Sequence, residues 1–193
     1  MLAGEFYDSR DAELLTMAHR ARELLTAFAA IPSVHGDRRR IVLTALLGNV
    51  GDGVWIEPPF FCDYGTHISI GAHTFVNVNC VFLDSATIEI GAYGLIGPGV
   101  QLLTATHPVN ADERIVDHSR ADASVGPAFE SPYRTRAASI RVGNKVWIGA
   151  GSLVMPGVTI GDGATIGAGS VVTHDIPPNV LAFGNPCRVQ RHL

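Results

Sequence analysis

A six-residue repeat in the C-terminal half constrains this chain more than any other feature. In steps of six from residue 142, every anchor position holds a branched apolar residue, and glycine follows it in four of six cases. A period of six fits neither an α-helix nor an alternating strand. It predicts a coil with three flat sides and three corners, of roughly 18 residues. The anchors are Val142, Ile148, Val154, Ile160, Ile166 and Val172.

The same step of six runs through shorter series in the N-terminal half. They span residues 50–68, 70–88 and 90–102, and successive series are offset by two residues, as at Ile68-Ser69-Ile70. Glycine at the corners tolerates positive φ, and stacked coils satisfy each other's backbone groups. One coil cannot bury its apolar side alone, so the pattern predicts an all-β stack of parallel coils that folds as a unit. The spacing itself leaves the handedness open.

The first 49 residues are predicted to form a helical cap on this stack. Apolar residues at 14, 18, 21, 25 and 28 mark one face of a helix over residues 9–30, with Asp8 or Ser9 as its N-cap and Pro32 as its stop. A second helix is expected over residues 37–48, with Ile41, Val42, Ala45 and Leu46 inward. The charge run Arg38–Arg40 indicates a solvated side of that helix. We therefore divide the chain into a cap, residues 1–49, and a β-helix domain, residues 50–193.

Residues 104–139 interrupt the hexads and are interpreted as a long inserted loop. This segment contains three prolines and little periodicity, and it begins with Thr104-Ala-Thr-His107-Pro108 where a regular coil ends. Long loops in compact scaffolds are usually functional or disordered. The C-terminal segment, which holds Pro177, Pro178 and Pro186, is expected to end the stack because proline removes ladder donors.

Composition excludes several function classes. The formal charge of −4 argues against nucleic-acid binding, which usually shows a basic excess. The three cysteines show no CxxC spacing, which argues against a disulfide framework or structural zinc and favours a reducing cytoplasmic setting. No signal-peptide pattern and no membrane-spanning apolar stretch is found, so no membrane partner is expected.

Several segments resemble one family of enzymes. They are Ile56-Glu-Pro-Pro-Phe-Phe-Cys-Asp63-Tyr-Gly65, Asn77-Val-Asn79, Thr106-His107-Pro108-Val109, Val146-Trp147-Ile148-Gly149 and Gly184-Asn-Pro-Cys-Arg188. With the helical cap and the hexads, they resemble the hexapeptide-repeat sugar O-acetyltransferases, specifically the maltose and galactoside branch, which also includes nodulation acetyltransferases. The resemblance implies a left-handed parallel β-helix, acetyl-CoA as co-substrate, a sugar acceptor, and a homotrimer with its sites between subunits.

The resemblance also assigns the chemistry of acetyl transfer. His107 matches the catalytic histidine, and an imidazole titrates near neutrality, which suits a general base for a sugar hydroxyl. The backbone N–H of Ala150 is the expected donor to the oxyanion. His107 is thus the predicted catalytic residue, and the other histidines, such as His19, His35 and His118, are interpreted as structural or surface residues.

The remaining site residues divide into two groups. The acceptor is expected to contact Asp8, Asp63, Asn77 and Asp84, although each of these also suits a purely structural role. The cofactor group comprises Trp147, the small residues Ala150 and Ala168, Thr173, and two arginines near the tail that could pair with phosphates. These arginines are Arg188 and Arg191.

Three departures from the family pattern bear on the acceptor, the cofactor and the inserted loop. Galactoside enzymes carry a second carboxylate after Asp84, and Ser85 stands here instead, which favours a maltose-like or broader acceptor range. A family lysine after Thr173 is His174 here, which weakens one expected phosphate contact. The loop between Arg114 and Ser139 is longer than the family suggests, and its role is left open.

Three alternatives remain on sequence grounds. An antibiotic or nodulation-type acetyltransferase would keep the chemistry and change the acceptor. A zinc enzyme of the γ-carbonic-anhydrase type would need three converging histidines, and its candidates by count include His67, His73, His107 and His118. A non-catalytic scaffold is the third. No metal is expected, because the loop residues show no ligand spacing.

Overall fold

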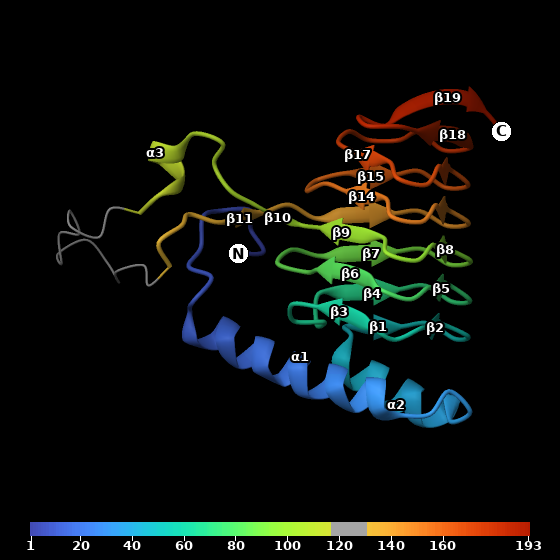
Figure 1. The fold of residues 1–193 in the computed structure, drawn as a ribbon, viewed down its shortest axis with the longest axis horizontal. Helices are drawn as coiled ribbons and strands as arrows, with labels where there is room; N and C mark the ends of the chain where they lie inside the picture. The colour runs from blue at the N-terminus through green and yellow to red at the C-terminus, as the bar shows by residue number, and fades with distance from the viewer. Residues whose placement is uncertain (117–130) are drawn as a thin grey trace.

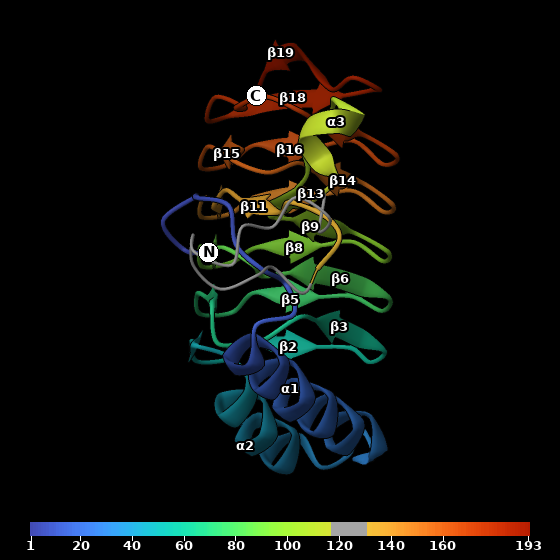
Figure 2. The same cartoon turned by 90° about the vertical axis from the view of Figure 1, so that its left-hand side faces the viewer.

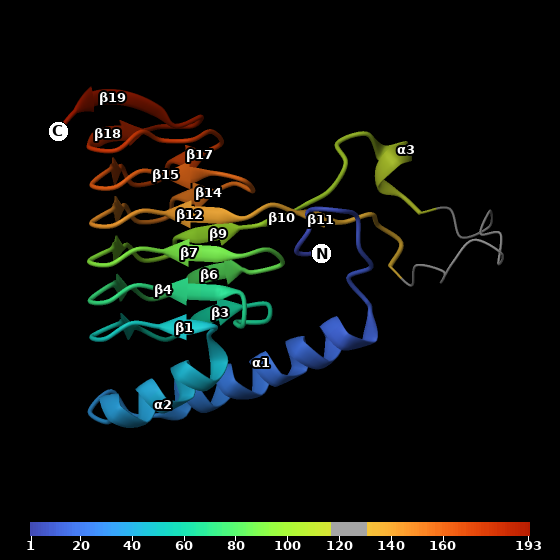
Figure 3. The ribbon, with the colours of Figure 1, turned by 180° about the vertical axis from the view of Figure 1, so that it is seen from behind.

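The chain folds into a stack of parallel coils with two helices beneath it (Figure 1). The structure is a computed structural model and describes residues 1–116 and 131–193. As the chain rises it passes from the sheet at the back to the sheet on the right and then to the sheet in front, which is a left-handed turn (Figures 1, 2 and 3). The fold is therefore the predicted left-handed parallel β-helix with a helical cap and an inserted loop.

Three sheets form the sides of the prism, and each strand within them is short. Sheet 1 contains β1 (Asn49–Val50), β4 (Ile68–Ile70), β7 (Ile88–Ile90), β12 (Ile140–Val142) and β15 (Thr159–Ile160). Sheet 2 contains β2 (Trp55–Ile56), β5 (Phe75–Val76), β8 (Leu95–Ile96), β13 (Trp147–Ile148), β16 (Thr165–Ile166), β18 (Val180–Phe183) and β19 (Arg188–His192). Sheet 3 contains β3 (Phe60–Cys62), β6 (Cys80–Leu83), β9 (Gln101–Leu103), β14 (Leu153–Val154) and β17 (Val171–Val172).

The predicted anchors fill the interior of the prism. All six anchors of the C-terminal series are buried, and so are the small or β-branched residues two positions before the next anchor, such as Ser152 and Ala164. The core continues without a break into the cap through Leu25, Phe28 and Leu46. Because each coil shares its apolar interior with its neighbours, the cap and the stack form one hydrophobic core.

Coil length differs between the two halves of the stack. Val142 pairs with Ile160, a step of eighteen residues, as the repeat predicts. Val50 pairs with Ile70 in the N-terminal half, a step of twenty. The two additional residues lie between sheet 3 and sheet 1. The anchors on either side of that corner are Cys62 and Ile70, which lie further apart than the six residues of a regular side. The two-residue offsets in the sequence thus widen one edge of the prism in each N-terminal coil.

Two edges of the prism carry most of the predicted site residues. The groove edge joins sheet 2 to sheet 3 and consists of residues 77–79, 97–100, 149–152 and 167–170. The loop edge joins sheet 3 to sheet 1 and includes residues 63–67, 84–87, 104–116 and 131–139. The inserted loop leaves the stack from the loop edge, the same edge that the two-residue offsets widen (Figures 1 and 3).

The stem of the inserted loop is a short antiparallel ladder. Strand β10 (Ala105–Thr106) pairs with β11 (Arg136–Ala137), and a short helix, α3 (Ala111–Arg114), follows on the outgoing side. Isolated bridges extend the stem, from Ile115 to Tyr133 and from Tyr7 to Thr135. The loop is therefore a projecting hairpin at its base, and the N-terminal segment lies beside β11 (Figures 1 and 3).

The first helix of the cap starts later than the sequence predicts. Helix α1 spans Ala12–Ala30, and its N-cap is Asp11, whose side chain accepts a hydrogen bond from the Glu13 N–H, so the predicted caps Asp8 and Ser9 are wrong. The Asp8 carboxylate instead accepts from the N–H groups of Arg10 and Ser131. The helix ends before Pro32 as predicted, and its buried residues are Ala21, Leu25 and Phe28.

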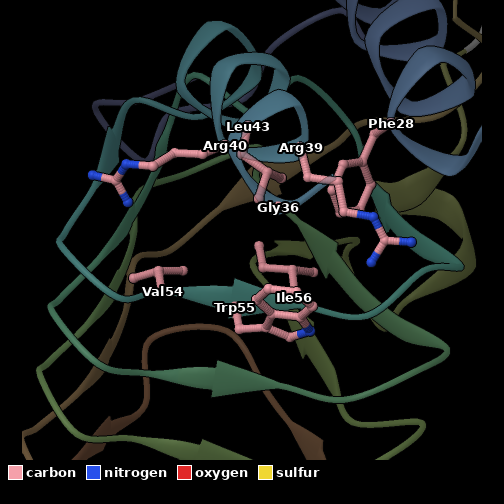
Figure 4. A pocket seen from close by; sticks show the side chains of 8 residues that line it. All are labelled: Phe28, Gly36, Arg39, Arg40, Leu43, Val54, Trp55 and Ile56. Carbon is pink, nitrogen blue, oxygen red and sulfur yellow. The ribbon is translucent and has the colours of Figure 1, made fainter. Parts of the chain in front are cut away.

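The second helix, α2 (Gly36–Leu46), corrects two sequence-based expectations. Ile41 and Ala45, both predicted to face inward, are exposed, whereas Leu43 and Leu46 face the core. Arg39 is buried although its two neighbours are not, and Arg39 and Arg40 point to opposite sides of the helix (Figure 4). The Arg39 guanidinium donates to the Ile31 carbonyl, so this arginine joins the end of α1 to α2. The charge run alone could not separate the two roles, because a helix turns successive residues to different faces.

The C-terminal end of the stack is closed by a change of strand direction. Strand β19 runs antiparallel to β18 and continues sheet 2, and an isolated bridge joins Ile176 to Ile160. Every residue of β19 is exposed. Across residues 1–116 and 131–193, no helix combines the length and the apolar character needed to cross a membrane.

Candidate active site

The groove edge carries an open apolar groove of about 500 Å³. Four predicted site residues lie together in its lining: Asn77, Trp147, Ala150 and Ala168. The outward-facing residues of sheet 2 supply the remaining apolar wall, including Leu95 and Leu181. The sequence assigns Trp147, Ala150 and Ala168 to the cofactor, and the structure places them side by side.

Small residues give the groove an exposed backbone. Coils stack so closely at this edge that a Cβ on Gly97 would lie 2.7 Å from the Ala150 nitrogen. Ala150 and Ala168 are exposed and carry only a methyl group each. The Ala150 N–H donates no hydrogen bond to any of the described residues, while its carbonyl accepts from Gly169 N at 2.8 Å. A backbone donor at the surface of an apolar groove is suited to bind a carbonyl oxygen or an oxyanion.

His107 lies on the loop edge, just beyond β10, with an exposed side chain. Its Nδ1 is 2.9 Å from the Arg134 carbonyl oxygen and 3.5 Å from the Thr135 hydroxyl. A carbonyl only accepts, so Nδ1 carries the proton of the neutral ring and Nε2 presents its lone pair to solvent. The Tyr133 ring stands edge-on to the imidazole, with centroids 6.4 Å apart. The imidazole is thereby held in the tautomer that a base acting through Nε2 requires.

Asp84 is fully buried beneath the same edge. One carboxylate oxygen accepts from Tyr64 N at 2.8 Å, and the other from His67 N at 3.3 Å. The His67 Nδ1 is 2.7 Å from the Asp84 carbonyl oxygen. Burial raises the pKa of Asp84, and the two N–H donors and His67 oppose that shift. With both oxygens engaged by backbone donors, Asp84 is placed to hold the turn at residues 63–67 and not to face a ligand.

Asp63 lies partly exposed beside this buried carboxylate. Burial, followed by the charge of Asp84, raises the pKa of Asp63 to about 6, while Arg22 opposes the shift. The Arg22 guanidinium donates to the carbonyls of Cys62 and Asp63 and lies over the Phe61 ring. Helix α1 therefore fixes the backbone of Asp63 and leaves its carboxylate at the surface of the loop edge.

The structure separates the predicted site residues into two sets. Asn77 lies in the groove, whereas Asp8, Asp63, Asp84 and His107 gather at the loop edge. Sheet 3 stands between the two edges. Six residues of extended chain cross this side, which amounts to roughly 20 Å. A ligand in the groove of one chain therefore lies a full face of the prism away from His107 of that chain.

The other three predicted cofactor residues lie near the C-terminal end of the stack. Thr173 is exposed after β17, with its hydroxyl 2.9 Å from His174 Nδ1. Arg188 and Arg191 lie in β19, and Arg191 pairs with Leu181 of the groove lining. The structure thus brings Arg191 to the upper end of the groove and leaves Thr173 on the opposite side of sheet 3.

Sequence reasoning misses four residues that shape the loop edge: Tyr7, Arg22, His67 and Tyr133. Their roles depend on contacts between segments far apart in sequence, as between Arg22 and Cys62. On sequence grounds, His67 is a candidate only as a zinc ligand by count. Residues 1–116 and 131–193 contain no group of three side chains suited to hold a metal ion, and His118 lies outside them.

A second pocket lies where α2 meets the first coil (Figure 4). Its volume is about 20 Å³, enough for about one water molecule. Arg39 Nη1 lies 3.6 Å from Glu57 Oε2 and has no hydrogen-bond partner within the described part of the chain. The pocket is too small for a substrate and belongs to the junction between cap and stack.

Comparisons with known proteins agree with this geometry. The bacterial transferase hexapeptide model, of six repeats, matches residues 139–174, and the maltose acetyltransferase hexapeptide capping motif matches residues 1–51. Nodulation protein L of Rhizobium meliloti (strain 1021) is 42% identical over 190 residues, covering 98% of this chain and 95% of that protein.

Two solved structures show the same fold over the whole chain. A maltose O-acetyltransferase from Clostridium difficile 630 has a TM-score of 0.88 and 37% identity, covering 100% of this chain and 94% of the other. A galactoside acetyltransferase in complex with coenzyme A has a TM-score of 0.86 and 35% identity, covering 98% of this chain and 87% of the other. With its hexads, its helical cap and these relatives along its full length, the chain belongs to the hexapeptide-repeat sugar O-acetyltransferases of the maltose and galactoside family.

Proposed function

We propose that this acetyltransferase moves the acetyl group of acetyl-CoA to a sugar hydroxyl, with His107 as general base. The observation that carries the proposal is the Nδ1 contact of His107 with the Arg134 carbonyl, which leaves Nε2 free to take a proton. The apolar groove with its small residues and surface N–H groups fits the pantetheine arm and thioester of acetyl-CoA. The solved relative in complex with coenzyme A supports acetyl-CoA as the co-substrate.

The reaction follows from these two features. Nε2 of His107 removes the proton of the acceptor hydroxyl as its oxygen attacks the thioester carbonyl. The Ala150 N–H stabilises the oxyanion that forms. When the tetrahedral intermediate collapses, the carbon–sulfur bond breaks and the CoA thiolate leaves with a proton returned by the His107 imidazolium. The ester and free CoA are the products, and no covalent enzyme intermediate is needed.

A second copy of the chain completes the site. His107 and the groove lie on different edges, so the histidine of one subunit must serve the groove of its neighbour. The outer surfaces of the sheets support this arrangement, because sheet 1 presents an ion pair of Glu89 with Arg141, whereas sheet 2 exposes Trp55, Leu95 and Trp147. An apolar sheet 2 beside a polar sheet 1 suits a closed trimer with sheet 1 facing solvent.

The remaining predicted residues take roles that their positions allow. Asp63 and Asp8 lie beside His107 on the loop edge and are the candidates to accept hydrogen bonds from the sugar. Asn77 enters from the groove of the neighbouring subunit. Asp84 positions the turn that carries Asp63. For the cofactor, Arg188 and Arg191 lie near the upper end of the groove, where phosphates could bind. Thr173 lies on the loop edge and would face the groove of the neighbouring subunit.

The acceptor is a maltose-like glucoside in this proposal, and a nodulation-type acceptor is the second candidate. Ser85 in place of a second carboxylate favours the former over a galactoside, and the similarity to nodulation protein L favours the latter. A panel of maltose, galactosides, chitin oligosaccharides and an antibiotic, assayed by thiol release, separates them by their kcat/KM values. We also propose a cytoplasmic location, because the three cysteines are free and buried.

The direct test is His107→Ala, measured by release of CoA thiol with a good sugar acceptor. Loss of the base should lower kcat by roughly 10²–10⁴ while the melting temperature stays unchanged, because His107 is exposed. His19→Ala, an exposed histidine on α1, is the matched control and should retain full activity. Transfer by His107→Ala within tenfold of the parent would show that another group acts as the base.

A further inference from the structure

Tyr133 exposes an aromatic ring directly beside His107. The centroids of the two rings lie 6.4 Å apart, and the ring planes are inclined by 69°. Tyr133 is 51% exposed, whereas Ser131 and Thr135, two positions to either side of it, are both buried. Tyr133 therefore presents apolar surface where an acceptor has to approach the proposed base, although the reaction as proposed gives this ring no part.

The backbone of Tyr133 is fixed by hydrogen bonds at both of its polar groups. The Ser131 hydroxyl accepts from Tyr133 N at 3.3 Å and donates to the Tyr133 carbonyl at 3.2 Å. Ser131 N in turn donates to the Asp8 carboxylate at 3.2 Å, which ties this segment to the N-terminal one. A tyrosine on a fixed backbone offers a large contact area and loses little conformational freedom when it binds a ligand.

Ile115 extends the same apolar surface across the stem of the inserted loop. It forms an isolated antiparallel bridge with Tyr133 and is 52% exposed. Backbone hydrogen bonds flank this bridge on both sides, from Arg134 N to the Arg114 carbonyl at 2.8 Å and from Val116 N to the Pro132 carbonyl at 3.0 Å. Ile115 and Tyr133 are therefore a non-hydrogen-bonded pair, the kind whose side chains share one face and lie closest together.

We propose that Tyr133, extended by Ile115, is a platform on which a pyranose ring of the acceptor stacks, and that it selects ring sugars. The inference rests on the proposed acetylation of a sugar by His107. One face of a pyranose carries mainly C–H groups, and the face of an aromatic ring attracts the positive edges of such groups. Because the two ring planes are inclined by 69°, a sugar lying flat on Tyr133 presents its rim of hydroxyls to the imidazole. An acyclic polyol has no such face.

The test compares Tyr133→Ala with Tyr133→Phe, with maltose as acceptor and release of CoA thiol as the readout. Loss of the ring should raise the KM for maltose about tenfold, while kcat stays within about twofold of the parent and the KM for acetyl-CoA is unchanged. Tyr133→Phe keeps the aromatic face and should behave like the parent. Tyr93→Ala is the matched control, because it removes a ring that is 60% exposed on the edge joining sheet 1 to sheet 2.

An acyclic acceptor separates stacking from a merely structural role. With sorbitol, Tyr133→Ala should keep kcat/KM within about twofold of the parent, whereas kcat/KM for maltose falls about tenfold. A residue that only supports His107 would lower both values alike, through kcat. An unchanged KM for maltose, an equal loss with sorbitol, or a Tyr133→Phe as impaired as Tyr133→Ala would each overturn the inference. If Tyr133→Ala fails to fold, Tyr133→Leu, which keeps bulk without an aromatic face, decides by the same KM for maltose.

The two proposals fail in different ways. An inactive His107→Ala beside a Tyr133→Ala with the parental KM for maltose leaves the general base standing and removes only the platform. An active His107→Ala removes the general base, and the KM of Tyr133→Ala still decides whether the ring binds the acceptor. A Tyr133→Ala that loses its oligomeric state while its KM for maltose stays parental would assign the ring to a contact between subunits, which also overturns the platform.

Discussion

The groove edge and the loop edge are built from the same coils and differ in regularity. At the groove edge, successive coils repeat small residues such as Gly97, Gly149 and Gly167, and backbone approaches backbone closely. At the loop edge, the N-terminal coils carry two additional residues each, and the middle of the stack opens into the inserted loop. One edge offers a uniform apolar surface with the exposed Ala150 N–H, and the other gathers the buried Asp84, the half-buried Asp63 and the exposed His107.

This difference supports the proposed division of tasks between the two edges. A long, flexible thioester substrate needs a continuous surface with little side-chain bulk, which repetition supplies. Acid–base chemistry needs titratable groups with fixed contacts, whereas the regular coils repeat glycine and alanine along the groove edge. The irregular corners supply those groups without disturbing the anchors, because the additional residues lie outside the hydrophobic interior.

Apart from loss of His107, Ala168→Trp should give the largest effect, and it bears on the groove edge alone. An indole in the groove would block acetyl-CoA, so kcat/KM for acetyl-CoA should fall by about 10²-fold, or about 2.7 kcal/mol. Because Ala168 is exposed, the melting temperature should stay close to that of the parent. Ala92→Trp, a change of the same size on the edge that joins sheet 1 to sheet 2, is the control. A variant that binds acetyl-CoA normally in calorimetry would show that the groove is not its site.

Asp84→Asn should affect the loop edge by changing its fold. An amide can accept from Tyr64 N, but its NH₂ group would then face the N–H of His67, and two donors cannot satisfy each other. The loss should be about 1–3 kcal/mol in the free energy of unfolding. Chemical denaturation measures it, with Asp162→Asn at an exposed corner as the comparison. An unchanged stability would mean that Asp84 is protonated in the folded chain.

Asp63→Asn should have the smallest effect, seen in the pH dependence of stability. The folded chain holds the Asp63 proton up to about pH 6, whereas the unfolded chain releases it near its ordinary pKa, so stability falls as pH rises through that window. Solvent screening at this partly exposed group limits the loss to about 1 kcal/mol, or about 2–4 °C in melting temperature.

Thermal unfolding at pH 4 and pH 7 measures this loss, and the Asn variant should lose less stability between the two. The variant should keep part of the pH dependence of stability, because the pKa of Asp84 is also raised. Equal pH dependence in the parent and the variant would show that Asp63 titrates normally.

The scaffold could be predicted from the sequence because the hexad repeats a single local pattern many times. The anchors, the helical cap, the presence of an inserted loop and the stop at the C-terminal end all follow from periodicity, glycine and proline. The two-residue offsets were visible as well, although their consequence, twenty-residue coils widened at one edge, needed the strand register.

The contacts within the site could not be predicted, because they join segments without a shared pattern. The residues that orient His107 lie 27 and 28 positions away, and Asp8 meets Ser131 across 123 positions. The burial of Arg39 and the cap at Asp11 depended on the packing of α2 and on the local turn before α1. The resemblance to the family named most of the site residues, whereas the separation of Asn77 from His107 appeared only in the fold.

Mixed trimers test the central claim that the two edges serve one reaction from different subunits. His107→Ala and Ala168→Trp should each be nearly inactive alone. When the two variants are unfolded together and refolded as a mixture, some interfaces should pair an intact His107 with an intact groove, and thiol release should recover to about a quarter of the parent activity, as random pairing of equal amounts gives. Recovery to that level confirms a site shared between subunits. A mixture no more active than the two separate variants would contradict it, and would mean that one chain carries both edges of its own site.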